Sequence, residues 1–89
     1  MARVFFTSHL RALAPEQPLR AAGATVAEAL TALFAEHVQL RAYVLDEQGR
    51  LRKHMSVFAD GERLQHDTAL AHAIRPDTEL YVMQALSGG

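Results

Sequence analysis

Residues 25–38 read TVAEALTALFAEHV, and this stretch decides the fold that the sequence predicts. Thr25 and Glu28 fit a capping box, in which the threonine hydroxyl accepts a hydrogen bond from the backbone three residues on and the glutamate reaches back. A helix should therefore begin there. From Val26 onwards apolar residues recur at three- and four-residue steps, so the helix should be amphipathic through about Val38. Its expected buried stripe consists of Val26, Ala29, Leu30, Leu33, Phe34 and Val38.

Two segments with strand character precede this helix. Residues 3–8 combine β-favouring residues close to the N-terminus, and they predict a first strand. After a turn at residues 15–18, residues 19–22 predict a weaker second strand, the hairpin partner of the first. Because side chains alternate between the two faces of a sheet, Phe5 and Phe6 must lie on opposite faces. One of these two aromatic side chains therefore lies on the less buried face.

The segment after the helix gives mixed signals before strand patterns return. Residues 40–53 predict an irregular connection. Residues 55–64 predict a hairpin, because Asp60-Gly61 at its centre readily supplies the positive φ angles of a tight turn. Thr68 can cap a single helical turn, and residues 80–83 predict the final strand.

The predicted order is strand, strand, helix, strand, short strand, helical turn and strand. This is an α+β fold of the β-grasp kind: an N-terminal hairpin, one main helix packed across a mixed sheet, and a last strand that pairs beside the first. We therefore expect one ubiquitin-like β-grasp domain over residues 1–84. A flexible C-terminal tail over residues 85–89, ending in Gly-Gly, should follow it.

The composition excludes several classes of function. The chain has 89 residues, which is enough for one modest core. Its formal net charge of -1 lacks the basic excess that a nucleic-acid binder needs. It contains no cysteine, so neither a disulfide nor a thiolate site can form. No apolar run reaches the length of a membrane span, and the N-terminus lacks the pattern of a signal peptide, so we expect a cytoplasmic protein with no membrane partner.

The sequence also lacks the motifs of an enzyme or a metalloprotein. None of the histidines forms the i, i+3 or i, i+4 pair of a zinc motif on one helix. No serine lies in a nucleophile elbow, and no glycine-rich loop could hold a phosphate. We therefore expect no catalytic residue, no bound metal and no ATP site on this chain. The histidines are His9, His37, His54, His66 and His72.

The end of the chain, residues 80–89 with the sequence LYVMQALSGG, resembles the ThiS/MoaD family of sulfur carriers. Chains of that family end in an alternating strand, a short apolar stretch and Gly-Gly. Residues 58–63 are similar to the family's strand and polar turn, and residues 70–74 with residues 77–80 are similar to the turn before its last strand. With the first strand and the helix, the resemblance covers essentially the whole chain, except for residues 40–54, which match none of the family closely.

This resemblance implies that the group that reacts is the C-terminal carboxylate of Gly89. A partner enzyme, an adenylyltransferase of the ubiquitin-activating type, would adenylate it with ATP. Sulfide, a persulfide or a rhodanese-like protein would then supply sulfur, and the resulting thiocarboxylate on Gly89 would pass it to a sulfur-accepting synthase in a biosynthetic pathway. Because glycine has no Cβ, Gly88 and Gly89 let an extended tail enter a narrow active site. Ser87 is also small and fits the same interpretation.

Exposed apolar side chains near the tail would dock the partner enzyme. Each candidate could instead belong to the core, because the faces of the strands cannot be fixed without the register. The candidates for this docking patch are Phe5, Phe6, Tyr81, Met83 and Leu86.

Three further functions stay open beside that of a free sulfur carrier. The chain could be the small subunit of a molybdopterin-synthase-like complex, which would co-purify with a larger partner. It could be a ubiquitin-like modifier conjugated to lysines through Gly89. It could also be a β-grasp binding module with no covalent role, which would work without its tail. The sequence does not choose among the sulfur acceptors.

Overall fold

The main helix begins where the capping box predicts. In the computed structural model, which describes residues 1–7, 10–13 and 18–84, α2 spans Val26–Glu36. Thr25 Oγ1 accepts a hydrogen bond from the Glu28 backbone N–H at 3.2 Å. Glu28 Oε1 in turn accepts one from the Ala24 N–H at 3.0 Å. The buried residues of α2 are those of the predicted stripe up to this point: Val26, Ala29, Leu30, Leu33 and Phe34.

The prediction that this helix continues through Val38 is wrong. α2 ends at Glu36, His37 follows with φ of -125°, and a separate helix, α3, spans Val38–Val44. Because the helical backbone is interrupted at His37, the three- and four-residue spacing no longer aligns Val38 with the stripe, and its side chain is 70% exposed. Residues 40–53 were predicted to form an irregular connection, and this is wrong for their first part, which belongs to α3. The buried residues of α3 are Leu40 and Val44.

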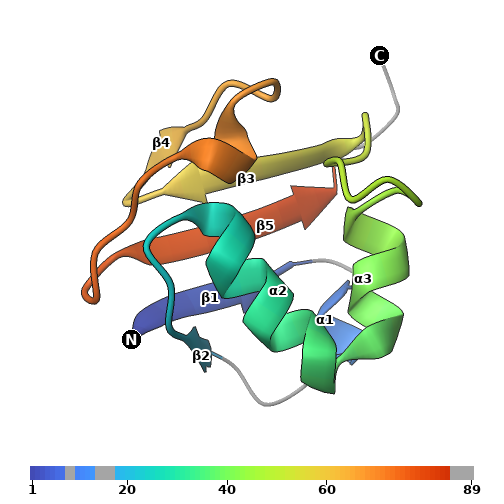
Figure 1. Cartoon of the computed structure of the whole chain (residues 1–89), viewed down its shortest axis with the longest axis horizontal. Coiled ribbons are helices and arrows are strands. Elements are labelled where there is room, and N and C mark those ends of the chain that lie inside the picture. Colours follow the sequence, from blue (N-terminus) through green and yellow to red (C-terminus); the bar gives the residue numbers. More distant parts are fainter. Residues whose placement is uncertain (8–9, 14–17, 85–89) are drawn as a thin grey trace.

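Five strands form one mixed sheet in the order β2-β1-β5-β3-β4. The central strand, β5, is parallel to β1 and antiparallel to β3, and both outer pairs are antiparallel. The predicted N-terminal hairpin and the predicted pairing of the first and last strands are thereby confirmed. Figure 1 shows α2 crossing one side of this sheet. The strands span Ala2–Phe6 (β1), Leu19–Ala21 (β2), Met55–Ala59 (β3), Glu62–Arg63 (β4) and Glu79–Gln84 (β5).

The hairpin between β3 and β4 has the predicted turn. Asp60 and Gly61 have φ angles of 49° and 87°, the left-handed region that a tight two-residue hairpin requires. Asp60 Oδ1 also accepts a hydrogen bond from the Glu79 N–H at 2.9 Å. The turn is thus tied to the first residue of β5.

Two short helical elements complete the described part of the chain. α1 spans Leu10–Leu13 and was not predicted, since four residues are too few to show a periodic pattern. η1, a 3-10 helix over Ala69–Ala71, follows Thr68 where a helical turn was predicted. The Thr68 side chain makes no capping hydrogen bond there, so this part of the prediction is wrong.

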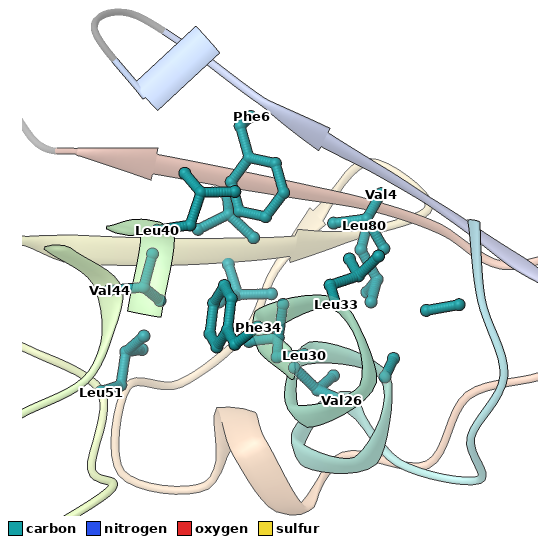
Figure 2. Close-up of a cluster of buried hydrophobic side chains, with 14 of the residues drawn as sticks. Val4, Phe6, Val26, Leu30, Leu33, Phe34, Leu40, Val44, Leu51 and Leu80 are labelled. Carbon is teal, nitrogen blue, oxygen red and sulfur yellow. The ribbon is translucent and has the colours of Figure 1, made fainter. Parts of the chain in front are cut away.

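The buried side chains of the strands and those of α2 pack together in one core between the sheet and the helices. Val4 and Phe6 of β1 and Leu80 of β5 are fully buried under α2. The rings of Phe6 and Phe34 lie 6.5 Å apart between centroids in a tilted arrangement. Figure 2 shows Phe6, Val4 and Leu80 facing Leu33 and Phe34 of α2.

We expect Leu33→Ala to lower the free energy of unfolding by about 2–5 kcal/mol, because it removes buried apolar surface and leaves a cavity. Leu33 is 3% exposed and lies at the centre of the helix stripe. Thr25→Ala should cost only about 1 kcal/mol, the value of a lost cap. Thr31→Ala on the exposed side of α2 is the matched control and should change stability by at most about 0.5 kcal/mol. Denaturant melts in which Leu33→Ala matches the parent would show that this face is not core.

Candidate functional site

The sheet presents a second face, opposite to the core, whose residues alternate with the buried ones. Residues directly paired in neighbouring strands share a face. The register pairs Phe5 with Tyr81, Tyr81 with Phe58, and Met83 with Ser56. These side chains are half-buried, whereas their sequence neighbours in β1, β3 and β5 on the core face are buried. We call this surface the outer face; it consists of Arg3, Phe5, Arg20, Ser56, Phe58, Arg63, Glu79, Tyr81 and Met83.

An aromatic row runs across the outer face at right angles to the strands. The rings of Phe5 and Tyr81 stack with centroids 4.5 Å apart and planes 9° from parallel. Tyr81 is paired on its other side with Phe58 of β3. The three rings therefore come from three adjacent strands, and Met83 follows two residues after Tyr81 on the same face. Aromatic residues and methionine are enriched where proteins dock on one another.

Charged side chains surround this row. Arg3 Nη2 and Glu79 Oε2 form an ion pair at 2.7 Å. Their side chains are 46% and 37% exposed, so the pair contributes little to stability. Arg20 and Arg63 lie on the outer strands β2 and β4, on either side of the aromatic row. The outer face is thus an apolar strip with arginines at both edges.

The structure places the predicted docking residues as follows. Phe5, Tyr81 and Met83 lie together on the outer face. Phe6 does not, because alternation turns its side chain into the core, where it is 2% exposed, and its assignment to the docking patch is corrected accordingly. Phe58 was not predicted as a site residue. Its strand was recognised, but only the pairing with Tyr81 reveals which face Phe58 occupies.

The remaining predicted site residues lie outside the described residues: Leu86, Ser87, Gly88 and Gly89. The structure does show where the described chain ends. β5 is the central strand and ends at Gln84, which pairs with Met55 at the start of β3. Gln84, the last described residue, therefore lies in the middle of the sheet, next to the Met83 end of the outer face.

Histidines and acidic residues do not gather in the described part of the chain. No three His, Asp or Glu side chains within residues 1–7, 10–13 and 18–84 lie close enough to hold a metal ion. His66 has a local role, since its Nε2 donates a hydrogen bond to the Arg52 carbonyl at 2.9 Å. Among these residues no helix has the length and apolar character needed to cross a bilayer.

One acidic side chain has a perturbed pKa, and its role is structural. Asp46 Oδ1 accepts hydrogen bonds from the backbone N–H groups of Arg50, at 2.9 Å, and Gln48, at 2.8 Å. The Arg50 hydrogen bond, assisted by the one from Gln48, holds the pKa of Asp46 below its ordinary value. These bonds close the turn between Leu45 and Leu51, which are bridged to each other. Asp46 is therefore a turn-forming residue.

Comparison with solved structures agrees with this architecture. No protein-family model and no curated protein sequence matches the chain. SAMP1 from Haloferax volcanii is 28% identical with a TM-score of 0.83, over 99% of this chain and 98% of that one. A chain of the Amycolatopsis orientalis BexX/CysO complex is 23% identical with a TM-score of 0.86, over 100% of both chains. CysO from Mycobacterium tuberculosis, described as an antigen, is 20% identical with a TM-score of 0.82, over 97% of this chain and 100% of that one.

The chain has the ubiquitin-like β-grasp fold of the sulfur carriers and small modifiers. The resemblance that residues 80–89 suggested is thereby confirmed. The similarity to SAMP1 and to CysO from Mycobacterium tuberculosis spans nearly the whole length of both proteins. The candidate site of this β-grasp protein is the outer face, which reaches Met83 next to Gln84, the last described residue.

Proposed function

We propose that the chain is a sulfur carrier whose Gly89 carboxylate is activated by a partner enzyme and converted to a thiocarboxylate. The observation that carries this proposal is the position of β5. This central strand bears Tyr81 and Met83 on the outer face and ends at Gln84, and the sequence after it, ALSGG, ends in two glycines. In a protein with this β-grasp fold, the proposed docking surface thus adjoins Gln84, the residue after which the Gly-Gly segment follows in the sequence.

The chemistry needs a partner, because a carboxylate is a poor electrophile at neutral pH. The partner transfers AMP from ATP to a Gly89 carboxylate oxygen and releases pyrophosphate. Sulfide, or a persulfide with a reductant to release the product, then attacks the carbonyl carbon, and the C–O bond to AMP breaks. Gly89 is left with one sulfur in place of one oxygen, ready for a sulfur-accepting synthase. Because the reaction consumes ATP, we place it in the cytoplasm.

The outer face supports docking of such a partner. Phe5, Tyr81 and Phe58 present an aromatic strip, and aromatic anchors of this kind carry much of the energy of protein interfaces. Arg20 and Arg63 at the edges of the strip favour a partner whose contact surface has an acidic rim. A relative of the same fold is found with BexX in the Amycolatopsis orientalis complex, which supports a protein partner for this chain.

A second candidate function is that of a protein modifier. It is favoured by the similarity to the protein named small archaeal modifier protein 1 from Haloferax volcanii, which is 26% identical with a TM-score of 0.82. The same activated Gly89 would then be transferred to lysine amines of other proteins. Higher-mass conjugates in a cell extract, absent for a chain that lacks Gly89, would identify this function.

We expect deletion of Gly89, or addition of one residue after it, to abolish activation. The test is ATP–pyrophosphate exchange by the cognate adenylating enzyme, which reports formation of the acyl-adenylate alone. Because the described sheet ends at Gln84 and the described core contains no later residue, we expect the thermal melting of both variants to match that of the parent. Full exchange with the Gly89-deleted chain would contradict the proposal.

Docking is tested by Met83→Asp, which puts a charge into the outer face, and by Leu86→Asp, which puts one into the segment that follows β5 in the sequence. We expect kcat/KM for adenylation to fall about thirtyfold or more, corresponding to about 2 kcal/mol for an interface hot spot. Val38→Asp is the matched control, because Val38 is equally apolar, is 70% exposed and lies on α3, away from the outer face. If both substitutions leave the kinetics unchanged in a folded protein, the outer face is not the docking surface.

A further inference from the structure

Residues 38–54 form a basic segment in a chain that is otherwise acidic. They include four lysine and arginine residues and two acidic ones, whereas the rest of the chain has five basic and eight acidic residues. One of the two acidic side chains, Asp46, has its carboxylate engaged by two backbone N–H groups of its own turn. The four basic residues of the segment are Arg41, Arg50, Arg52 and Lys53.

Arg52 joins the last turn of α3 to the turn that enters β3. Its N–H donates to the Val44 carbonyl at 2.9 Å, and its Nε donates to the Ala42 carbonyl at 2.8 Å. The Met55 N–H donates to the Arg52 carbonyl at 3.0 Å and closes the second turn. The two turns thus form one corner of the molecule, which we call the α3 corner. Its exposed side chains are Arg41, Tyr43, Arg52, Lys53 and His54.

The α3 corner lies at the end of the sheet where β5 ends. Met55, which follows the turn at residues 52–54, pairs with Gln84 in the register of β3 and β5. Figure 1 shows the C-terminal end of α3, the start of β3 and the end of β5 at the same end of the sheet. The basic side chains of the corner are therefore near the residue after which the Gly-Gly segment follows in the sequence.

The α3 corner and the outer face lie on opposite sides of the sheet. Leu40 and Val44 of α3 are fully buried in the same core as Phe34 of α2, so α3 packs on the core side. The outer face is the other side of the sheet. A partner that covers the outer face therefore leaves the exposed side of α3 to a second protein.

Sulfur transfer needs such a second protein when the sulfur arrives as a persulfide on a protein. The acyl-adenylate forms in the active site of the adenylating enzyme, and the persulfide must reach it while the chain is still bound there. Five residues follow Gln84 in the sequence, and they span at most about 18 Å. A folded donor domain is wider than this distance. It can therefore contact the α3 corner while its persulfide is at the Gly89 carbonyl carbon.

We propose that the α3 corner is the docking surface for the protein that donates sulfur, a persulfide-bearing protein with an acidic contact surface. This inference rests on the proposed function, because the acceptor of the sulfur is the same acyl-adenylate. Arg41, Arg52 and Lys53 attract an acidic surface and repel a basic one. Tyr43, which is 53% exposed, adds an aromatic ring of the kind that is enriched at protein interfaces.

The sulfur is transferred in two displacement steps. The terminal sulfur of the donor's persulfide anion attacks the Gly89 carbonyl carbon, a C–S bond forms, the C–O bond to AMP breaks, and AMP leaves. The product is an acyl disulfide that joins the chain to the donor. A thiolate then attacks the donor's sulfur atom in this disulfide, and the S–S bond breaks. The thiocarboxylate leaves on Gly89, and the thiol and the donor are joined in a new disulfide.

The experiment compares two sulfur sources in the presence of the adenylating enzyme and ATP. One is sulfide, which needs no docking surface, and the other is a rhodanese from the same organism, charged with persulfide by thiosulfate. Without free thiol the rhodanese reaction should stop at the acyl disulfide, which the mass of the intact species identifies.

We expect Arg41→Glu combined with Lys53→Glu to slow formation of the acyl disulfide about tenfold or more at low ionic strength, and less at high salt. Tyr43→Ala should slow it at both ionic strengths. ATP–pyrophosphate exchange and the formation of thiocarboxylate from sulfide should match those of the parent, because neither uses the α3 corner.

Arg75→Glu is the charge-matched control for Lys53→Glu. Arg75 lies in the loop before β5, at the opposite end of that strand, and its side chain is 79% exposed. This control should react with the rhodanese at the rate of the parent.

Three results would overturn the inference and spare the proposed function. The first is an equal rate with the rhodanese for the parent and the variants of the α3 corner. The second is no acyl disulfide from the rhodanese although sulfide yields thiocarboxylate. The third is slower pyrophosphate exchange by folded variants of the corner, which would place this surface in adenylation. Absence of exchange with the parent chain would contradict both the inference and the proposed function.

Discussion

The parallel pairing of β1 with β5 is the constraint on which the rest of this structure depends. The register aligns Val4 with Leu80 and Phe5 with Tyr81. Because side chains alternate, this register sends Val4 and Leu80 under α2 and leaves Phe5 and Tyr81 stacked on the outer face. A slip of one residue in either strand would exchange the two faces and put aromatic rings where the aliphatic core belongs. The core and the candidate docking surface are thus set by the same pairing.

The same pairing places the last described strand beside the outer face. A parallel neighbour for β1 requires a crossover, and α2, α3 and the β3–β4 hairpin lie between the two strands in sequence. β5 is the last strand in the sequence and occupies the centre of the sheet. Its final residue, Gln84, lies beside the Met83 end of the outer face, the surface that we propose for docking.

The sequence predicted the strand order and most local turns, but it did not predict the break at His37 or which side chains lie on each face of the sheet. The capping box at Thr25 and the Asp60-Gly61 turn act through neighbouring residues, and both formed as predicted. The break at His37 was missed because the apolar spacing runs on through Val38, although the backbone does not. The choice between Phe5 and Phe6, and the presence of Phe58 on the outer face, depend on strand register, which contacts between distant segments decide.

The most direct test of the account is the mass of the intact protein after incubation with its adenylating enzyme, ATP and a sulfur donor. The account predicts a gain equal to the difference between one sulfur and one oxygen, located by fragmentation on Gly89. A binding module without a covalent role would show no change in mass. No gain with an enzyme that binds the chain, or a gain located on an internal residue, would contradict the assignment of Gly89 as the sulfur-carrying residue.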